Sequence, residues 1–171
     1  GGVRHSLNIE KFKYTGLAKT YCENCVVTDS GAAASALATG SKVPFKSISF
    51  GKDQTKPLKT IMDVAKSAGK STGVVTMDSI VGATPSAFYA HAPRRDQKIL
   101  LANQIEKSGL KLLLGGGRGV LHPQGWSDPD VPAKKSSRRD SRDLVSEITS
   151  AGWEVTESGD DFSKNFESYI K

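Results

Sequence analysis

The chain has 171 residues, of which 37% are hydrophobic and 25% charged, and these values are typical of a globular domain. The length allows one domain with a fair core and does not require two, and no window is apolar enough to cross a bilayer. The formal charge of +6 and the pI near 9.3 are compatible with a nucleic-acid partner, and the first residues lack the pattern of a secretory signal.

Two cysteines, Cys22 and Cys25, form a C-x-x-C motif near the N-terminus. Such a motif can be a redox pair or half of a zinc ribbon. A ribbon needs a second pair, and a redox motif usually opens a helix, whereas residues 21–27 have an extended pattern. We therefore expect a local disulfide or two free thiols, and both fit an exported protein.

Residues 26–40 predict a strand that turns into a helix with a serine at the junction. The β-branched Val26 and Val27 lead into Asp29 and Ser30, and the small residues that follow favour a helix that ends at Gly40. The N-terminus of a helix carries partial positive charge and unpaired N–H groups, which favour a serine alkoxide and a phosphate oxygen. The alternative is structural, because Asp and Ser are also common N-cap residues.

Helices and strands alternate along the rest of the chain. Helical patterns cover residues 57–69, 97–108, 142–151 and 161–170, and short apolar strands cover residues 73–76, 110–114 and 153–155. This order predicts an α/β fold with a doubly wound, mostly parallel sheet that is flanked by helices and buried on both faces. The ligand site of such a fold lies beyond the carboxyl ends of the strands, where we place Ser30 and residues 82–84.

Three glycines, Gly115 to Gly117, follow the second of these strands and precede Arg118. The run superficially resembles a phosphate-binding loop but lacks the Lys-Ser/Thr ending and the dinucleotide-binding spacing. We interpret it as a tight strand exit.

A basic segment follows a turn-rich stretch at residues 126–132. No aromatic interleaving or known binding module accompanies it, so we expect a solvated surface loop and no nucleic-acid partner. Its basic residues are Lys134, Lys135, Arg138, Arg139 and Arg142.

Three collinear motifs give the chain a family resemblance. They are the Asp-Ser-Gly-Ala-Ala-Ala-Ser run at residues 29–35, the Ala-Thr-Pro-Ser…Ala-His…Arg pattern at residues 83–95, and the Leu-Gly-Gly-Gly run at residues 114–117. Together they resemble the alkaline phosphatases, strongly from residue 14 to residue 123 and more weakly to residue 171. Ser35 stands where the family usually has threonine, and the serine keeps a small hydroxyl at this position.

The resemblance implies roles for four residues. Ser30 would be the nucleophile that forms a covalent phosphoserine and also a zinc ligand, and Arg95 would bind two phosphate oxygens. Asp29 would orient Arg95, and Thr84 would be a magnesium ligand. The family uses two zinc ions and one magnesium ion, and we expect most of their ligands outside this sequence.

Three neighbouring residues are assigned differently. Arg94 is expected to face solvent, and His91 is expected to be structural rather than a ligand. Gly82 departs from many relatives, which have an aspartate or histidine there, so we expect the third metal site to be weaker or differently hydrated.

The sequence holds only three histidines, His5, His91 and His122, and none lies at i, i+4 spacing to another, so no self-contained zinc site is expected. We interpret residues 1–171 as a single partial domain of a larger alkaline phosphatase catalytic domain, lacking the N-terminal strand and the C-terminal metal-ligand region. As an isolated piece it is expected to be nearly inactive.

For the whole protein the resemblance implies hydrolysis of phosphate monoesters with release of inorganic phosphate, a homodimer, and an extracellular, periplasmic or cell-surface location, with membrane anchoring left open. One alternative is a catalytically inactive fragment or basic module that binds anions or nucleic acid. Another is a transferase or phosphodiesterase on the same fold, although Arg95 favours a monoester because a diester has less terminal charge to bind.

Overall fold

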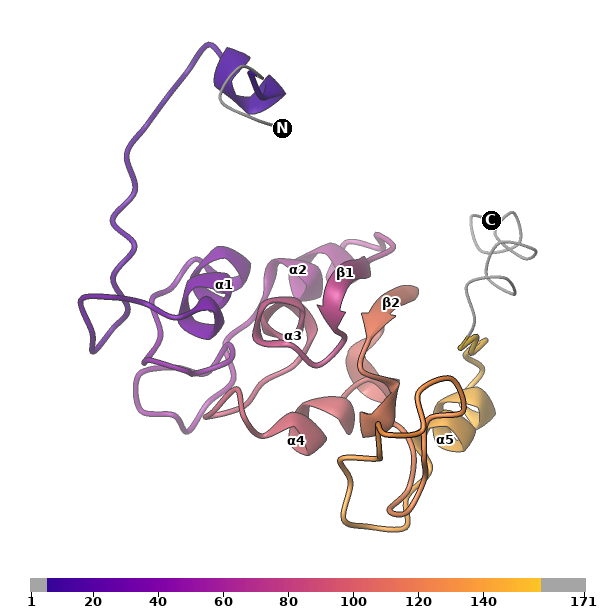
Figure 1. Ribbon diagram of the computed structural model, residues 1–171. Coiled ribbons are helices and arrows are strands. Elements are labelled where there is room, and N and C mark those ends of the chain that lie inside the picture. The colour runs from indigo at the N-terminus through magenta and orange to yellow at the C-terminus, as the bar shows by residue number, and fades with distance from the viewer. Residues whose placement is uncertain (1–5, 158–171) are drawn as a thin grey trace.

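The computed structural model describes residues 6–157, and Figure 1 shows its elements. In chain order the helices are α1 (Ser30–Thr39), α2 (Ile61–Ser67), α3 (Ala83–Tyr89), α4 (Lys98–Ala102) and α5 (Leu144–Ser150), and the strands are β1 (Gly73–Ser79) and β2 (Leu112–Gly116). Short 3-10 helices lie at Asn8–Lys11, Glu106–Ser108 and Arg118–Val120. In the described part of the chain, no helix has the length and apolar character to span a membrane.

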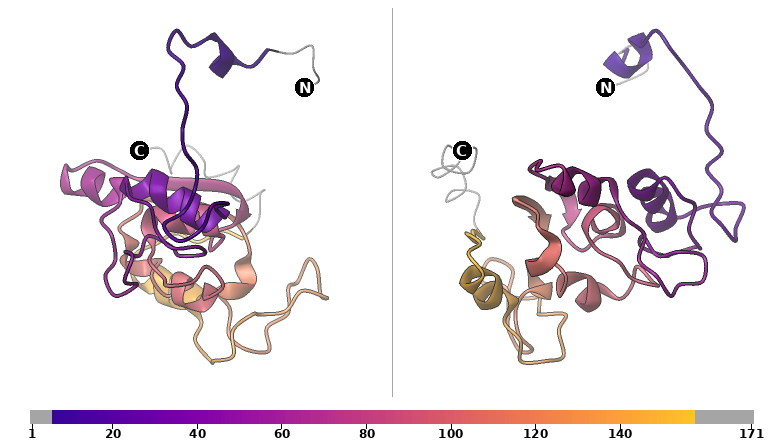
Figure 2. Two further views of the ribbon diagram at one scale, coloured as in Figure 1. Left: turned by 90° about the vertical axis from the view of Figure 1, so that its left-hand side faces the viewer. Right: turned by 180° about the vertical axis from the view of Figure 1, so that it is seen from behind.

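β1 and β2 form a parallel two-stranded sheet in which Gly73 pairs with Leu112 and Ser79 with Gly116. α1 packs on α3, and α3 packs on β1, so the elements lie side by side in that order (Figures 1 and 2). The sheet and the helices beside it confirm the predicted α/β class. The main core lies among these elements and includes Ile48, Val81, Ala87, Leu101 and Ile105.

Side-chain caps explain where the helices begin and end. Thr60 Oγ1 accepts a hydrogen bond from the Asp63 N–H at 3.2 Å, and Asp63 accepts one from the Thr60 N–H at 2.9 Å, so α2 starts at Ile61 rather than at residue 57. Gly40 and Gly69 have φ values of 72° and 70°, as expected of helix ends. The helix predicted at residues 97–108 is shorter, because α4 ends at Ala102 and only a 3-10 turn follows.

Two predicted strands are wrong. Residues 26–27 form a bend and residues 153–155 have no regular structure. Val26 and Val27 are 88% and 79% exposed, and no neighbouring strand in the described residues offers them backbone partners. β-branched residues favour a strand only where a sheet is present to receive them. The helix predicted at residues 161–170 lies outside the described residues.

The prediction of a sheet buried on both faces is also wrong for the described residues. Val75 and Met77 of β1 are 71% and 106% exposed, while Val74 is buried. The described helices cover one side of β1 and leave these two side chains open.

The basic segment is only partly a solvated loop. Lys134 and Arg139 are exposed, as predicted, but Arg138 is 2% exposed. Its guanidinium donates to Asp140 at 2.6 Å and to the Val120 carbonyl at 3.3 Å, which satisfies the buried charge. Arg118 and Arg142 are likewise paired with carboxylates, so much of the basic charge in this region is locally balanced.

The interpretation of the three glycines as a strand exit is right only for Gly117, because Gly115 and Gly116 are the last two residues of β2. A Cβ atom on Gly115 would lie 2.6 Å from the Thr76 methyl group, and one on Gly117 would lie 2.8 Å from Ser79 Cβ. Gly117 also has a φ of 86°, which side chains rarely adopt. The glycines therefore allow the end of β2 to lie directly against the end of β1.

We expect Gly117→Ala to destabilise the protein by about 3 kcal/mol, because it combines backbone strain with a steric clash. Gly125→Ala is the matched control, since Gly125 has a φ of 89° but no atom within 4 Å of its would-be Cβ. The Gly125→Ala control should lower the free energy of unfolding by about 1 kcal/mol, from backbone strain alone. Urea unfolding of the protein in its natural length measures both, and equal losses would show that the contact with β1 is unimportant.

Candidate active site

Ser30 is the first residue of α1, and its side chain is exposed. Asp29 caps the helix by accepting hydrogen bonds from the Gly31 N–H at 3.0 Å and the Ala32 N–H at 3.1 Å. The predicted placement of Ser30 at a helix N-terminus is therefore confirmed. The expectation of unpaired N–H groups is wrong for Gly31 and Ala32, because the Asp29 carboxylate already occupies them.

Small residues bring α1 close to its neighbours. Its buried residues include Ala34, Ser35 and Ala38, and the facing part of α3 buries Ala83 and Ala87. The Ser35 hydroxyl donates to the Gly31 carbonyl at 2.7 Å and accepts from the Ser49 N–H at 2.8 Å. The hydroxyl at position 35 thus fixes α1 against the segment that follows it.

Arg95 lies beside Ser30, although 65 positions separate the two residues. Its Nη1 atom donates to Ser30 Oγ at 2.6 Å and to Asp29 Oδ2 at 3.0 Å. Within the described residues, its Nε and Nη2 atoms have no hydrogen-bond partner. The guanidinium is therefore anchored on one side and retains donors on the other.

Asp29 is a strongly held carboxylate. Burial raises its pKa, but hydrogen bonds from the Lys46, Ala32 and Gly31 N–H groups and from Arg95 outweigh burial, so the pKa lies below its ordinary value. Because the folded-state pKa is lowered, the ionised form stabilises the fold above the ordinary pKa. This contribution is lost only as the pH falls through the lowered pKa, so Asp29 stays ionised at neutral and alkaline pH.

Arg94 points away from this cluster. Its side chain is 56% exposed and pairs with Asp96 at 2.7 Å. The expectation that Arg94 faces solvent is confirmed.

Thr84 lies in the first turn of α3 and is exposed. Because α3 begins at Ala83, Pro85 occupies the third helical position. Proline is tolerated there because the first N–H groups of a helix have no intrahelical acceptor.

Gly82 caps α3 without a side chain, and its surroundings are crowded. A Cβ atom there would lie 2.9 Å from both Asp78 Cγ and the Ser79 carbonyl oxygen. The Asp78 carboxylate therefore fills the space that a side chain at position 82 would enter.

His91 serves the core rather than the Ser30 cluster. Its Nε2 atom lies 2.9 Å from the Leu58 carbonyl oxygen, and its backbone is hydrogen-bonded to the Gln104 side chain at 2.9 Å. These contacts agree with the structural role expected for His91.

Lys46 belongs to the site but gave no signal in the sequence. Its backbone N–H donates to Asp29 Oδ1 at 2.9 Å, and its carbonyl accepts from the Arg95 N–H at 2.8 Å. Lys46 has a φ of 65°, which turns both groups toward the site. A glycine at position 46 would have indicated such a backbone conformation in the sequence, whereas a lysine does not.

The described residues do not contain a group of three or more His, Cys, Asp or Glu side chains that could hold a metal ion. The site residues that could each supply one oxygen ligand to a metal ion are Ser30 and Thr84, through their hydroxyl groups. Among the described residues, Arg95 is the only hydrogen-bond partner of Ser30 Oγ, and a guanidinium does not accept a proton. The described residues thus present guanidinium donors and no proton acceptor at Ser30 Oγ.

The fold and the site define an α/β protein that presents a serine hydroxyl, an ionised aspartate and an arginine at one helix N-terminus. The family model described as alkaline phosphatase matches residues 2–169. The chain belongs to the alkaline phosphatase family.

Among curated relatives, the repressible alkaline phosphatase of Saccharomyces cerevisiae is 36% identical over 163 residues, covering 92% of this chain and 28% of the relative. The alkaline phosphatase of Gadus morhua is 30% identical, covering 85% of this chain and 36% of the relative. The chain therefore spans about a third of the length of these relatives.

Solved structures agree. The alkaline phosphatase of the Antarctic bacterium TAB5 has a TM-score of 0.80 and 30% identity, covering 95% of this chain and 44% of its own. The enzyme of Thermus thermophilus has a TM-score of 0.74 and 30% identity, covering 86% of this chain and 28% of its own. One structure of a TAB5 variant has Mg bound in its M3 site.

Proposed function

We propose that the protein carrying this chain hydrolyses phosphate monoesters, with Ser30 as the nucleophile. The observation that carries the proposal is the Arg95 guanidinium, which donates to Ser30 Oγ and to the ionised Asp29 while its other donors remain available. A fixed cation beside an exposed serine matches the needs of a phosphoryl group that arrives with negative oxygens.

In this mechanism Ser30 Oγ gives up its proton to solvent and attacks phosphorus. The bond from phosphorus to the ester oxygen breaks, the leaving oxygen takes up a proton from water, and a phosphoserine forms. Water then attacks the phosphoserine and releases inorganic phosphate. Arg95 binds two phosphate oxygens in both steps, because a guanidinium supplies two parallel donors that a lysine ammonium cannot match. Asp29 holds Arg95 in place and, being ionised, balances its charge.

The residues present fit the metal ions that the family uses. Ser30 would be a zinc ligand and Thr84 a magnesium ligand, and the remaining ligands of two zinc ions and one magnesium ion would come from outside residues 1–171. When bound, the zinc ions lower the proton affinity of the serine hydroxyl and stabilise the leaving oxygen. Gly82 offers no side chain to the magnesium site, so this site is weaker or differently hydrated than in relatives with aspartate or histidine there.

The wider assembly is also part of the proposal. Residues 1–171 form a single partial domain of a larger catalytic domain, and the whole protein is a homodimer that works outside the cytoplasm. The disulfide between Cys22 and Cys25 supports an oxidising compartment.

The test is hydrolysis of p-nitrophenyl phosphate at alkaline pH by the protein in its natural length. We expect turnover that is lost after dialysis against a chelator and restored by zinc with magnesium, because the described residues supply no base for Ser30. Turnover that survives verified removal of the metals would contradict the metal part of the proposal, and no turnover in the metal-loaded protein would contradict the function.

A further inference from the structure

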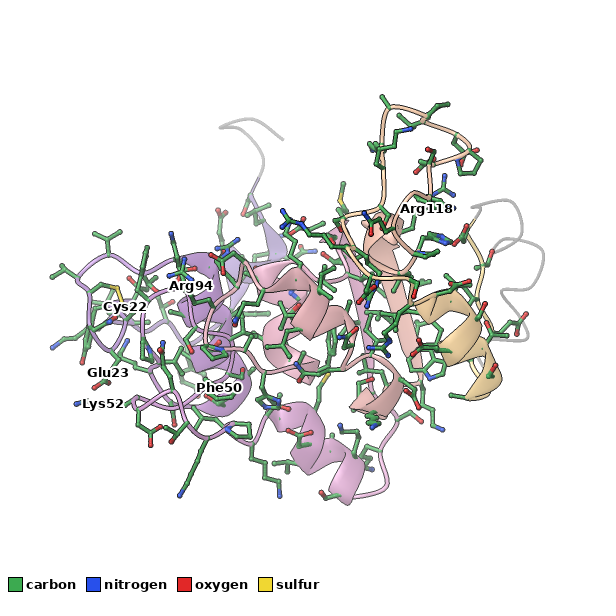
Figure 3. The ribbon with its side chains drawn as sticks, turned by 90° about the horizontal axis from the view of Figure 1, so that it is seen from below. Cys22, Glu23, Phe50, Lys52, Arg94 and Arg118 are labelled. Atoms are coloured by element: carbon green, nitrogen blue, oxygen red, sulfur yellow. A yellow bond between two sulfur atoms is a disulfide. The ribbon has the colours of Figure 1, made fainter. Side chains whose placement is uncertain are left out.

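A disulfide turn lies next to the site. Cys22 and Cys25 form a disulfide, and the Cys22 N–H donates to the Cys25 carbonyl at 3.0 Å, which closes residues 22–25 into a tight turn (Figure 3). Cys22 is 3% exposed and packs with Val43 and with Ala32, the second residue after Ser30. Cys25 is only half-buried and is therefore the accessible end of the disulfide.

The turn holds residues 42–46, which we call the strap. The Glu23 N–H donates to the Val43 carbonyl at 3.0 Å, and the Phe45 N–H donates to Asn24 Oδ1 at 2.8 Å. Glu23 and Asn24, the residues of the turn that make these hydrogen bonds, lie between the two cysteines. The disulfide thus fixes the two groups that dock the strap.

The strap in turn holds Asp29 and Arg95. Lys46, its last residue, donates its N–H to the Asp29 carboxylate and accepts from the Arg95 N–H through its carbonyl. A shift of the strap would therefore move both partners of the ion pair that lies against Ser30. Hydrogen bonds at both ends of the strap, joined by its covalent backbone, thus connect the disulfide turn to Arg95.

We infer that the Cys22–Cys25 turn is a positioning element for phosphate binding, and that reducing the disulfide weakens this binding. The inference rests on the proposed function, because it assigns Arg95 to phosphate. The closed loop is very short, so the disulfide restricts the unfolded chain little and its loss acts mainly on local geometry.

The Cys22–Cys25 disulfide is reduced by thiol–disulfide exchange with a dithiol. A thiolate of the dithiol attacks the Cys25 sulfur, the S–S bond breaks, and Cys22 leaves as a thiolate that takes up a proton. The second thiol of the reductant then displaces Cys25 from the mixed disulfide. The two cysteines gain two electrons and two protons, and the dithiol becomes its own disulfide.

The experiment compares the oxidised protein in its natural length with the same protein after dithiothreitol and with the double variant Cys22→Ser, Cys25→Ser. We expect the KM for p-nitrophenyl phosphate and the Kd for inorganic phosphate, measured by calorimetry, to rise about tenfold in both altered forms, the effect of weakening one charge-assisted hydrogen bond. The kcat should change less than about twofold, because Ser30 itself is untouched. Hydrogen exchange at the strap amides should become faster.

Controls separate this effect from others. Dithiothreitol should leave the double variant unchanged, and elemental analysis should show equal metal content, which excludes metal removal by the thiol. Asn24→Ala should raise KM with the disulfide intact, because it removes the acceptor for Phe45. Lys52→Gln should leave KM unchanged, because the exposed Lys52 side chain contributes only an ion pair with the Glu23 carboxylate.

The outcomes distinguish the two hypotheses. An active protein whose KM and phosphate Kd are the same with and without the disulfide overturns the inference and leaves the proposed function standing. A protein without turnover overturns the proposed function, and the phosphate Kd then decides the inference: an unchanged Kd, or no phosphate binding in the oxidised form, overturns it.

Discussion

Replacing Ser30 with alanine should lower kcat by at least about a thousandfold, because it removes the protein atom that forms a covalent bond to phosphorus in the proposed mechanism. The fold should survive, since the Ser30 side chain is exposed and Asp29 caps α1 with the backbone N–H groups of Gly31 and Ala32. Steady-state hydrolysis of p-nitrophenyl phosphate measures the loss.

Ser71→Ala is the matched control, because Ser71 is an exposed serine in a loop that precedes β1. It should hydrolyse the substrate at the rate of the unaltered protein. A Ser30→Ala variant that keeps more than about a tenth of the activity would refute the role of Ser30 as nucleophile.

Replacing Arg95 with alanine should lower kcat/KM about a hundredfold and weaken inorganic phosphate as a competitive inhibitor. The guanidinium is the only cation that contacts Ser30 Oγ in the described part of the chain, and charge-assisted pairs of this kind are strong. Arg95→Lys should recover part of the loss at neutral pH, because lysine keeps the charge but not the fork of two donors.

The adjacent arginine provides the control. Arg94 has the same chemistry one position away, but it pairs with Asp96 in solvent. Arg94→Ala should therefore change kcat/KM less than about twofold. Equal losses at both positions would show that general positive charge, rather than the placement of Arg95, is what matters.

The sequence predicted best those features that are fixed by local chemistry. α1 lies between an Asp cap and a Gly40 stop, and both signals are visible in the sequence. The resemblance at residues 83–95 implied the phosphate-binding role for Arg95 rather than Arg94, and Arg95 is the arginine that contacts Ser30. The assignment of roles to these residues stays a prediction.

Features that depend on distant partners could not be predicted. Val26 and Val27 have strand propensity, yet they lack a neighbouring strand in the described residues and form a bend. Arg138 lies in a polar, basic run, yet Asp140 and the Val120 carbonyl allow it to be buried. Lys46 enters the site through its backbone alone, so its residue type carries no information about that role.

The central claim is that Ser30 carries the phosphoryl group between substrate and water. The most direct test mixes the metal-loaded protein in its natural length with a phosphate monoester, quenches with acid, and measures the intact mass and then the peptide masses. The account predicts an added mass of about 80 Da on the peptide that contains Ser30, and no addition in Ser30→Ala. Rapid turnover with no adduct, or an adduct on another residue, would contradict it.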